Sequence, residues 1–397
     1  MKKIKRTYIT KAILSLIALI LMISFTACRD DVELNLSENT DVDAPGVIGD
    51  YQGFYLLNEG NMGNNKSTLD FYDFETGVYT KNIYAERNPT VPKELGDVGN
   101  DIGIYEGKLY AVINTSNKVE VMDAVTTKRI GQIDIPNCRY IKFHDGYAYV
   151  TSYAGPVIVD PNYQQIGFVA KINTTTLKQE DQCLVGFQPE ELEIVDGKIY
   201  VANSGGYMGA GSTSGYERTV SVIDIATFKE EDRIDVAYNL ERIKADSRGD
   251  LWVSSRGDHN NLPARLFFID KEKQQVTDTI EIAASNYWLD DDLLYAYGTE
   301  FNQTTGDWTY SYNIVNTKTR KVIKQQIITD GTDKKIEKPY GIMVHPETKD
   351  IYITDAGSYV TTGILYCFDK DGNKKWSVAA GDIPAHFALL PASKQTD

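Results

Sequence analysis

The chain has 397 residues, a net charge of −15 and 42% hydrophobic residues, which is enough for one large or several smaller globular domains. The acidic balance argues against nucleic acid or an anionic lipid surface as a partner, because both repel a negatively charged protein. Cys138, Cys183 and Cys367 are far apart and lack CxxC spacing, so we interpret them as small buried apolar residues rather than a disulfide or zinc framework.

The first 28 residues have the pattern of a bacterial lipoprotein leader. A basic segment precedes an apolar run, Ala12 to Phe25, that is short for a bilayer-spanning helix and favours a signal peptide over residues 1–27. The small Ala27 before the lone Cys28 resembles a lipobox, although Phe25 stands where leucine is usual. The resemblance implies cleavage before Cys28 and lipidation of that residue; an ordinary signal peptide cut nearby is the alternative.

Residues 28–49 are predicted to be the lipidated cysteine and a flexible tether, because they are polar and show little periodicity. The acidic segment that starts at Asp30 resembles a surface-export signal of Bacteroidetes lipoproteins, and a solvated tether is the alternative. The leader holds five of the 41 basic residues and none of the 56 acidic ones, so the remaining chain has 36 against 56 and a net charge of −20. We expect a lipid-anchored protein on the outer membrane, exposed at the cell surface, that touches the membrane only through its lipid.

A unit of about 50 residues recurs from position 50 to 390. Each copy has an apolar strand, a tight turn, a strand with a central aromatic, a polar loop, a strand that ends near Asp or Asn, a second turn and a last strand. The aromatic markers are Tyr55, Tyr110, Tyr149, Tyr200, Trp252, Tyr295 and Tyr352. Seven units of four strands predict an all-β fold, a single seven-bladed β-propeller.

The two ends of the repeat region are complementary. The first unit starts at its second strand, GFYLLN, and an extra apolar segment, 383–390, follows the last unit. We expect this C-terminal segment to supply the missing innermost strand and close the ring, since closure leaves no long unpaired edge. Residues 391–397 are then a short C-terminal tail.

The loops between the second and third strands of the units are long and varied, whereas the other hairpin turns are short. In a propeller these loops share one face with the connections to the next blade, and such loops on a rigid scaffold are the usual place for a binding site. They are rich in Tyr, Trp, Asn, Ser and Gly, which is typical of recognition surfaces. Local packing of the tyrosines is the alternative. The predicted ligand-binding residues are Asn58, Tyr153, Asn203, Tyr207, Tyr216, Arg218, Arg256, Trp308 and Tyr359.

Two kinds of chemistry fit this sequence less well. The loop at 203–219 is rich in glycine but lacks the Lys-Ser/Thr pair of a phosphate-binding loop, and no helix follows it. Acidic and histidine residues occur near the expected axis, as in metal-dependent lactonases built on propellers, but they share no metal-ligand spacing. These residues are Glu190, Glu191, Glu193, Glu241, Asp246, His345 and His386. We therefore expect neither catalytic residues nor an intrinsic metal or cofactor.

Several segments resemble the YncE-like propeller lipoproteins of gut Bacteroidetes. They are LLNEGNMGNNKSTLDFYDFETG, LGDVGNDIGIYEGKLYAVINTSNKVEVMD, YGIMVHPETKDIYITDAG and GDIPAHFAL, together with the Cys28 leader. More narrowly, the chain is similar to the BtuG group of surface lipoproteins. That resemblance implies a non-enzymatic protein that binds cobalamin and other corrinoids tightly and passes them to a TonB-dependent outer-membrane transporter. A propeller that binds proteins or glycans, or a metal-dependent lactonase, are the alternatives.

Overall fold

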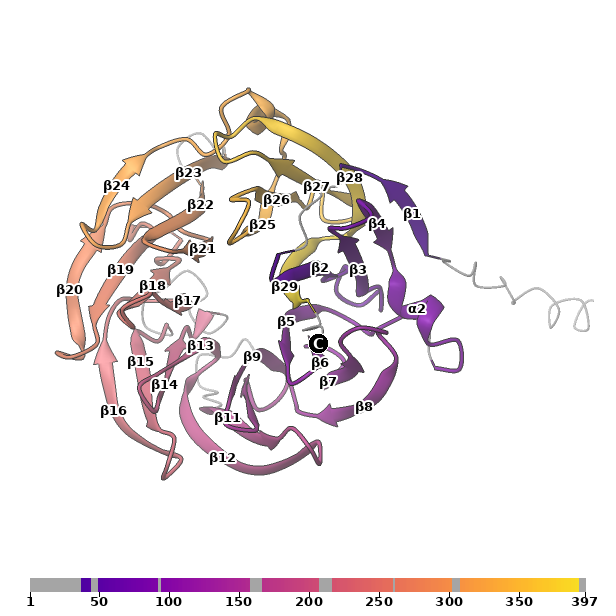
Figure 1. The fold of residues 1–397 in the computed structure, drawn as a ribbon. Coiled ribbons are helices and arrows are strands. Elements are labelled where there is room, and N and C mark those ends of the chain that lie inside the picture. The colour runs from indigo at the N-terminus through magenta and orange to yellow at the C-terminus, as the bar shows by residue number, and fades with distance from the viewer. Residues whose placement is uncertain are drawn as a thin grey trace, which may run out of the picture. The chain divides into compact units, whose positions relative to one another are not determined.

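Seven β-sheets are arranged around a central axis in the computed structural model (Figure 1). The structure describes residues 37–43, 49–91, 94–157, 166–206, 216–259, 261–301 and 308–392. Each sheet is antiparallel and forms one blade of a propeller. Six of the seven sheets follow chain order from the axis outward, and the blade that joins the two ends of the repeat region does not. The prediction of a seven-bladed, four-stranded β-propeller is confirmed.

Blades 2 to 4 each contain four consecutive strands. Their bounds are β5 (Gly99–Tyr105), β6 (Lys108–Ile113), β7 (Lys118–Asp123) and β8 (Arg129–Asp134); β9 (Cys138–His144), β10 (Tyr147–Ser152), β11 (Ile166–Asn173) and β12 (Lys178–Phe187); and β13 (Pro189–Val195), β14 (Lys198–Asn203), β15 (Thr219–Asp224) and β16 (Lys229–Asp235).

Blades 5 to 7 repeat the same arrangement. Their bounds are β17 (Leu240–Ala245), β18 (Leu251–Ser255), β19 (Arg265–Asp270) and β20 (Gln275–Ile280); β21 (Asn286–Asp290), β22 (Leu293–Phe301), β23 (Trp308–Asn316) and β24 (Lys321–Lys324); and β25 (Pro339–Val344), β26 (Ile351–Asp355), β27 (Thr362–Phe368) and β28 (Lys374–Asp382).

Blade 1 joins the two ends of the repeat region. It consists of β2 (Tyr51–Asn58), β3 (Thr68–Asp73) and β4 (Val78–Lys81), with β29 (Pro384–Pro391) as the innermost strand. In Figure 1 the yellow β29 lies beside the indigo β2. The two strands pair antiparallel, with Phe54 opposite Leu389. The predicted closure of the ring by the C-terminal segment is confirmed.

The structure adds three elements that the repeat pattern does not predict. Strand β1 (Glu38–Asp41) pairs with β4 at the outer edge of blade 1, within the segment predicted to be a flexible tether. A short helix, α2 (Ile83–Arg87), follows β4, and a 3-10 turn covers Thr332–Lys335. Helix α2 buries Ile83 and Tyr84 against blades 1 and 2. Among the described residues, no helix has both the length and the apolarity to cross a membrane.

The second strand of every blade carries the aromatic marker into the core between blades. All seven markers are buried, with at most 8% of their surface exposed. They are Tyr55, Tyr110, Tyr149, Tyr200, Trp252, Tyr295 and Tyr352. The three described cysteines, Cys138, Cys183 and Cys367, are free thiols and buried, which confirms their interpretation as apolar core residues.

The outer hairpin turns share one device. An Asp or Asn at the end of the third strand accepts backbone N–H groups from the turn, as Asp123 does from Val125 and Thr126. The same contacts occur at Asn173 and Asp270. The hairpin turns between the third and fourth strands are therefore short. The longer loops between the second and third strands lie on the opposite face, where they can form a site.

Candidate functional site

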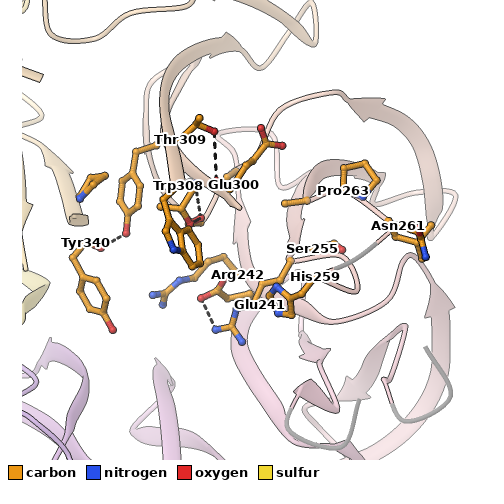
Figure 2. Close-up of a pocket in the computed structure, with 18 of the residues that line it drawn as sticks. Glu241, Arg242, Ser255, His259, Asn261, Pro263, Glu300, Trp308, Thr309 and Tyr340 are labelled. Atoms are coloured by element: carbon orange, nitrogen blue, oxygen red, sulfur yellow. Dashed lines mark hydrogen bonds and ion pairs between the residues drawn. The ribbon is translucent and has the colours of Figure 1, made fainter. Parts of the chain in front are cut away.

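A cavity of about 900 Å³ opens over blades 5 to 7. Its wall includes parts of the loops between the second and third strands of blades 5 and 7, as well as the connection between β20 and β21. The cavity therefore lies on the face where the long loops predict a site. The lining residues used below are Glu241, Arg242 and Arg256 of blade 5, Tyr297, Glu300 and Trp308 of blade 6, and Tyr340 and Tyr359 of blade 7 (Figure 2).

The cavity coincides with a separation between two inner strands. Around the axis, each inner strand packs on the next one from β21 through β25, β29, β5, β9 and β13 to β17, whereas β17 and β21 hardly touch. Residues on both sides of this seam line the cavity. The hollow is thus a feature of the ring itself, and both strands and loops form its wall.

Aromatic side chains form the wall on the blade 6 and blade 7 side. Trp308 at the start of β23 is 56% exposed and Tyr359 is 40% exposed. The rings of Tyr340 and Tyr359 meet edge to face, with their centroids 5.9 Å apart. The Tyr297 hydroxyl donates to the backbone carbonyl of Tyr340, and the Tyr340 hydroxyl donates to Glu59 at 2.8 Å. These bonds hold the wall rigidly and leave ring surface available for a ligand.

The polar ring around the axis comes from the residues that open each inner strand. In several inner strands the pairing with the second strand shifts near its start, for example between Pro189 and Leu192 in β13 and between Leu240 and Ile243 in β17. Such a bulge re-aims the extra side chains, and bulges are frequent next to functional sites. The re-aimed residues include the pairs Glu190-Glu191 and Glu241-Arg242.

Glu190 is the centre of a buried network between blades 3, 4 and 5. Arg139 donates two hydrogen bonds to it, at 2.8 and 3.1 Å, and the Tyr153 hydroxyl donates a third. Arg256 lies 3.8 Å away and donates to Glu241 at 2.6 Å. Burial alone raises the pKa of Glu190, but Arg139 and Arg256 outweigh burial and lower it, so the carboxylate stays ionised.

Glu191 and Glu193 are also paired. Glu191 accepts a hydrogen bond from Lys244 at 2.6 Å, and Glu193 accepts one from Lys142 at 2.9 Å. Burial raises the pKa of Glu191, while Lys244, Arg242 and Lys142 more than offset it and lower it. Because each of these carboxylates is already paired with a cation of the fold, its position is explained without a metal ion. A role as a metal ligand is less well supported for the same reason.

The remaining axis candidates of the sequence analysis are separated from one another. His386 lies 3.0 Å from Glu59, Asp246 pairs with Arg248, and His345 packs its ring against Phe74. Within the described ranges, no three His, Cys, Asp or Glu side chains converge in a way that could hold a metal ion.

Three of the predicted ligand-binding residues line the cavity, and they come from three different blades: Arg256, Trp308 and Tyr359. Arg218 is placed elsewhere: it pairs with Asp235 and lies over the ring of Tyr238 at 4.8 Å. Tyr207 and Cys28 lie outside the described residues.

The other predicted ligand-binding residues are buried and have structural partners or packing. Tyr153 and Tyr216 are 3% and 8% exposed. Asn58 and Asn203 are fully buried at the ends of the second strands of blades 1 and 4, where their amides donate across to the third strand. Loop position alone did not distinguish these buried side chains from exposed ones.

Sequence reasoning missed Arg242, Tyr297 and Tyr340 as parts of the site. Arg242 and Tyr340 belong to inner strands, which the loop argument did not consider. A usable signal was present, because polar pairs interrupt the apolar pattern where these strands begin, as in LERIKA and PEELEIV. Tyr340 opens the segment YGIMVHPETKDIYITDAG.

Fold and cavity together define a seven-bladed β-propeller with a concave site of ligand-binding size on its loop face. The chain belongs to the DUF5074 family, described as a domain of unknown function, whose model matches residues 52–388. No curated protein matches the sequence significantly.

Several solved structures share the fold. A quinonprotein alcohol dehydrogenase-like protein from Bacteroides thetaiotaomicron is 14% identical, with a TM-score of 0.56 over 85% of this chain and 78% of that one. Apo AztD from Citrobacter koseri is 10% identical, with a TM-score of 0.51 over 87% and 99%. Hydrazine synthase from Kuenenia stuttgartiensis is 16% identical, with a TM-score of 0.53 over 69% and 77%. At these identities the likeness concerns the fold alone.

Proposed function

We propose that this protein is a non-enzymatic binding protein that captures a corrinoid such as cobalamin in the cavity over blades 5 to 7. The observation that carries the proposal is the cavity itself, whose volume of about 900 Å³ is at the upper end for small-molecule sites. A rim of exposed aromatic rings and buried polar groups surrounds it. The similarity of the chain to the BtuG group supports the same ligand class.

The chemistry of a corrinoid suits this wall. A corrinoid is a broad macrocycle with amide side chains around its edge. Trp308 and Tyr359 offer exposed ring surface for apolar contact, and Arg256 offers N–H donors for amide carbonyls. The Tyr340 hydroxyl donates its proton to Glu59, so its oxygen can accept from an amide N–H of the ligand. The cobalt enters within its macrocycle, so no metal ligand from the protein is needed for capture.

The proposal also includes where the protein is located in the cell and which protein receives the ligand. The lipoprotein-like leader supports anchoring at the outer membrane through Cys28, with the propeller at the cell surface. Capture would then precede transfer to a TonB-dependent transporter in the same membrane. Met62 and Val360, in loops of the same face, are 73% and 68% exposed, so their side chains are accessible to such a contact.

Calorimetric titration of cyanocobalamin into protein that lacks residues 1–28 tests the proposal. We expect saturable binding with one ligand per chain and no change after treatment with EDTA. An absence of heat and of any absorbance shift at micromolar cobalamin would refute corrinoid capture. Outer-membrane pull-down and a glycan array on the same sample would then test the protein- and glycan-binding alternatives.

A further inference from the structure

Arg242 differs from every other cation at the axial end of the cavity. Its residue is only 9% exposed, and it lines the cavity. Its Nε is buried without a hydrogen-bond partner, and no ion pair to a carboxylate within 4 Å is formed by its side chain among the described residues. Its guanidinium lies 5.0 Å from the ring centre of Tyr140, a contact that offers no acceptor oxygen.

The neighbouring carboxylates are already paired with other cations. Glu190 pairs with Arg139, Glu191 with Lys244, Glu193 with Lys142 and Glu241 with Arg256. Arg242 is therefore the remaining positive charge in this group. Asp101, another buried acid near the axis, accepts the backbone N–H of Ile141, and burial raises its pKa toward the neutral form.

Arg242 keeps its charge at this position. Burial by itself lowers the pKa of the guanidinium, but Tyr140, Glu241 and Glu191 outweigh burial and hold the pKa well above its ordinary value. The Nε–H of Arg242 is a donor that is buried without an acceptor, which costs free energy. A complementary group is thus expected to enter from the cavity.

The geometry points to an oxyanion subsite at Arg242, where a phosphate or carboxylate group of the bound ligand completes the buried guanidinium. Figure 2 shows the Arg242 side chain extending from β17 toward the side of the cavity where Tyr340 lies. Guanidinium binds such groups through two parallel hydrogen bonds, which satisfies its donors and its charge together. Glu300, the exposed acid of the lining, stands on the rim and leaves the inner end cationic.

For the ligand proposed above, the subsite specifies an orientation. This step rests on the proposed function: the phosphodiester of the nucleotide loop is the anionic group of cobalamin, so this loop would enter the cavity first. The corrin plane would then lie toward Trp308 and Tyr359 at the opening. A free oxyanion or another phosphorylated molecule would bind Arg242 through the same hydrogen bonds. Two binding comparisons, one with phenyl phosphate and one with corrinoids, separate these ligands.

The first arm uses phenyl phosphate as a probe, with Arg242→Met as the variant and Arg233→Met as its control. Arg233 lies on the outer strand β16, where it pairs with Glu230, away from the cavity. The native protein and the control are expected to bind phenyl phosphate at millimolar concentration, and the variant to lose about tenfold or more in affinity. Arg242 also helps to hold the neighbouring Glu191 ionised, so Arg242→Met is expected to lower the thermal midpoint. A cooperative unfolding transition above the assay temperature shows that the variant is folded, so misfolding does not explain a loss of affinity.

The second arm compares cobalamin with cobinamide, a corrinoid without the nucleotide loop and its phosphodiester. Arg242→Met is expected to lower the affinity for cobalamin by about tenfold or more and to change the affinity for cobinamide by no more than about twofold. Equal losses for both ligands would assign Arg242 to a rim amide and overturn the oxyanion subsite. Unchanged cobalamin binding in the variant would overturn it as well.

The two arms also separate this inference from the proposed function. If native protein binds phenyl phosphate through Arg242 but binds no corrinoid, the subsite stands and corrinoid capture fails. If it binds cobalamin and Arg242→Met has no effect on either arm, capture stands and the subsite fails. An absence of phenyl phosphate binding by the native protein overturns the subsite.

Discussion

His386 Nε2 lies 3.0 Å from Glu59 Oε1, although 327 residues separate the two side chains. His386 belongs to the closing strand β29, and Glu59 directly follows β2, with which β29 pairs. Glu59 also accepts the hydroxyl of Tyr340 from the cavity wall. Closure of the ring and the shape of the site are therefore physically connected, which leads to the first prediction.

Deletion of residues 384–397 should lower the thermal midpoint by about 10 °C or more. The truncation removes an eight-residue strand and exposes the buried partners of Ala388 and Leu390, a loss of several kcal/mol by about 25 cal/mol per Å² of apolar area. Differential scanning calorimetry measures the shift. A shorter truncation after Ala392 keeps β29 and should leave the midpoint unchanged; an equal midpoint for both would contradict closure by β29.

Trp308→Ala should weaken binding of the captured ligand about tenfold without affecting folding. The ring is 56% exposed and lines the cavity, so its removal takes apolar surface from the proposed site while costing the core little. Ile323→Ala, on the outer strand β24, is the control because Ile323 is 57% exposed. Titration calorimetry with cyanocobalamin should separate the two variants, and identical affinities would remove Trp308 from the site.

Tyr153→Phe should lower the stability of the fold and leave ligand affinity unchanged. The lost hydroxyl donates to buried Glu190, so its removal should cost about 1–3 kcal/mol of unfolding free energy. Tyr153 is 3% exposed and does not line the cavity, so ligand affinity should be unaffected. Chemical denaturation and titration on the same preparation check both statements; a stable variant with reduced affinity would restore Tyr153 to the site.

Acid should destabilise the fold through Glu190 and Glu191. Burial is outweighed by Arg139 at Glu190 and by Lys244 at Glu191, so both pKa values are lower in the folded state than the ordinary value of 4.5. A lowered carboxyl pKa contributes stability that is present above pH 4.5 and is lost as the pH falls through the folded value.

Thermal midpoints measured from pH 7 to pH 3 should therefore fall most steeply below about pH 4.5. A Glu190→Gln variant should start at a lower midpoint, because Arg139 loses its charged partner, and should show a shallower fall. Equal slopes for native protein and variant would argue against a role for Glu190 in acid sensitivity.

Cys138, Cys183 and Cys367 should not react with a thiol reagent in the folded protein that lacks residues 1–28. All three are buried, and burial raises the pKa of Cys138 to about 12, so thiolate is scarce at pH 8. Unfolding in guanidinium should release three thiols per chain in a colorimetric assay. Fewer than three would indicate a disulfide that the structure does not contain.

The architecture was predictable from the chain because its information is local and repeated. Alternating strands, Gly turns and seven aromatic markers each report a half-buried strand, and their spacing yields the number of blades. The extra segment at 383–390 followed from counting strands. Strand β1 was not predictable, since ENTD has no apolar alternation and its pairing with β4 becomes visible only once the outer edge of blade 1 exists.

The site was predictable as a face but only partly as residues. Trp308, Tyr359 and Arg256 line the cavity, whereas Asn58 and Asn203 close strand ends inside the blades. A loop residue and a strand-end residue have similar neighbours in sequence, yet one side chain meets solvent and the other meets a third strand. Exposure depends on that packing, which sequence position does not report.

From the chain alone follow the propeller, its seven units, its closing strand and the face with long loops, because each depends on short-range periodicity. Folding alone decides that β17 and β21 separate and that Glu190, Glu191, Glu193 and Glu241 each pair with a cation. It also decides that, within the part of the chain that the structure describes, Arg242 forms no ion pair with a carboxylate. Three of these pairs, Glu190–Arg139, Glu191–Lys244 and Glu193–Lys142, join residues from neighbouring blades. Charge balance in the cavity therefore depends on distances across the ring that no single repeat contains.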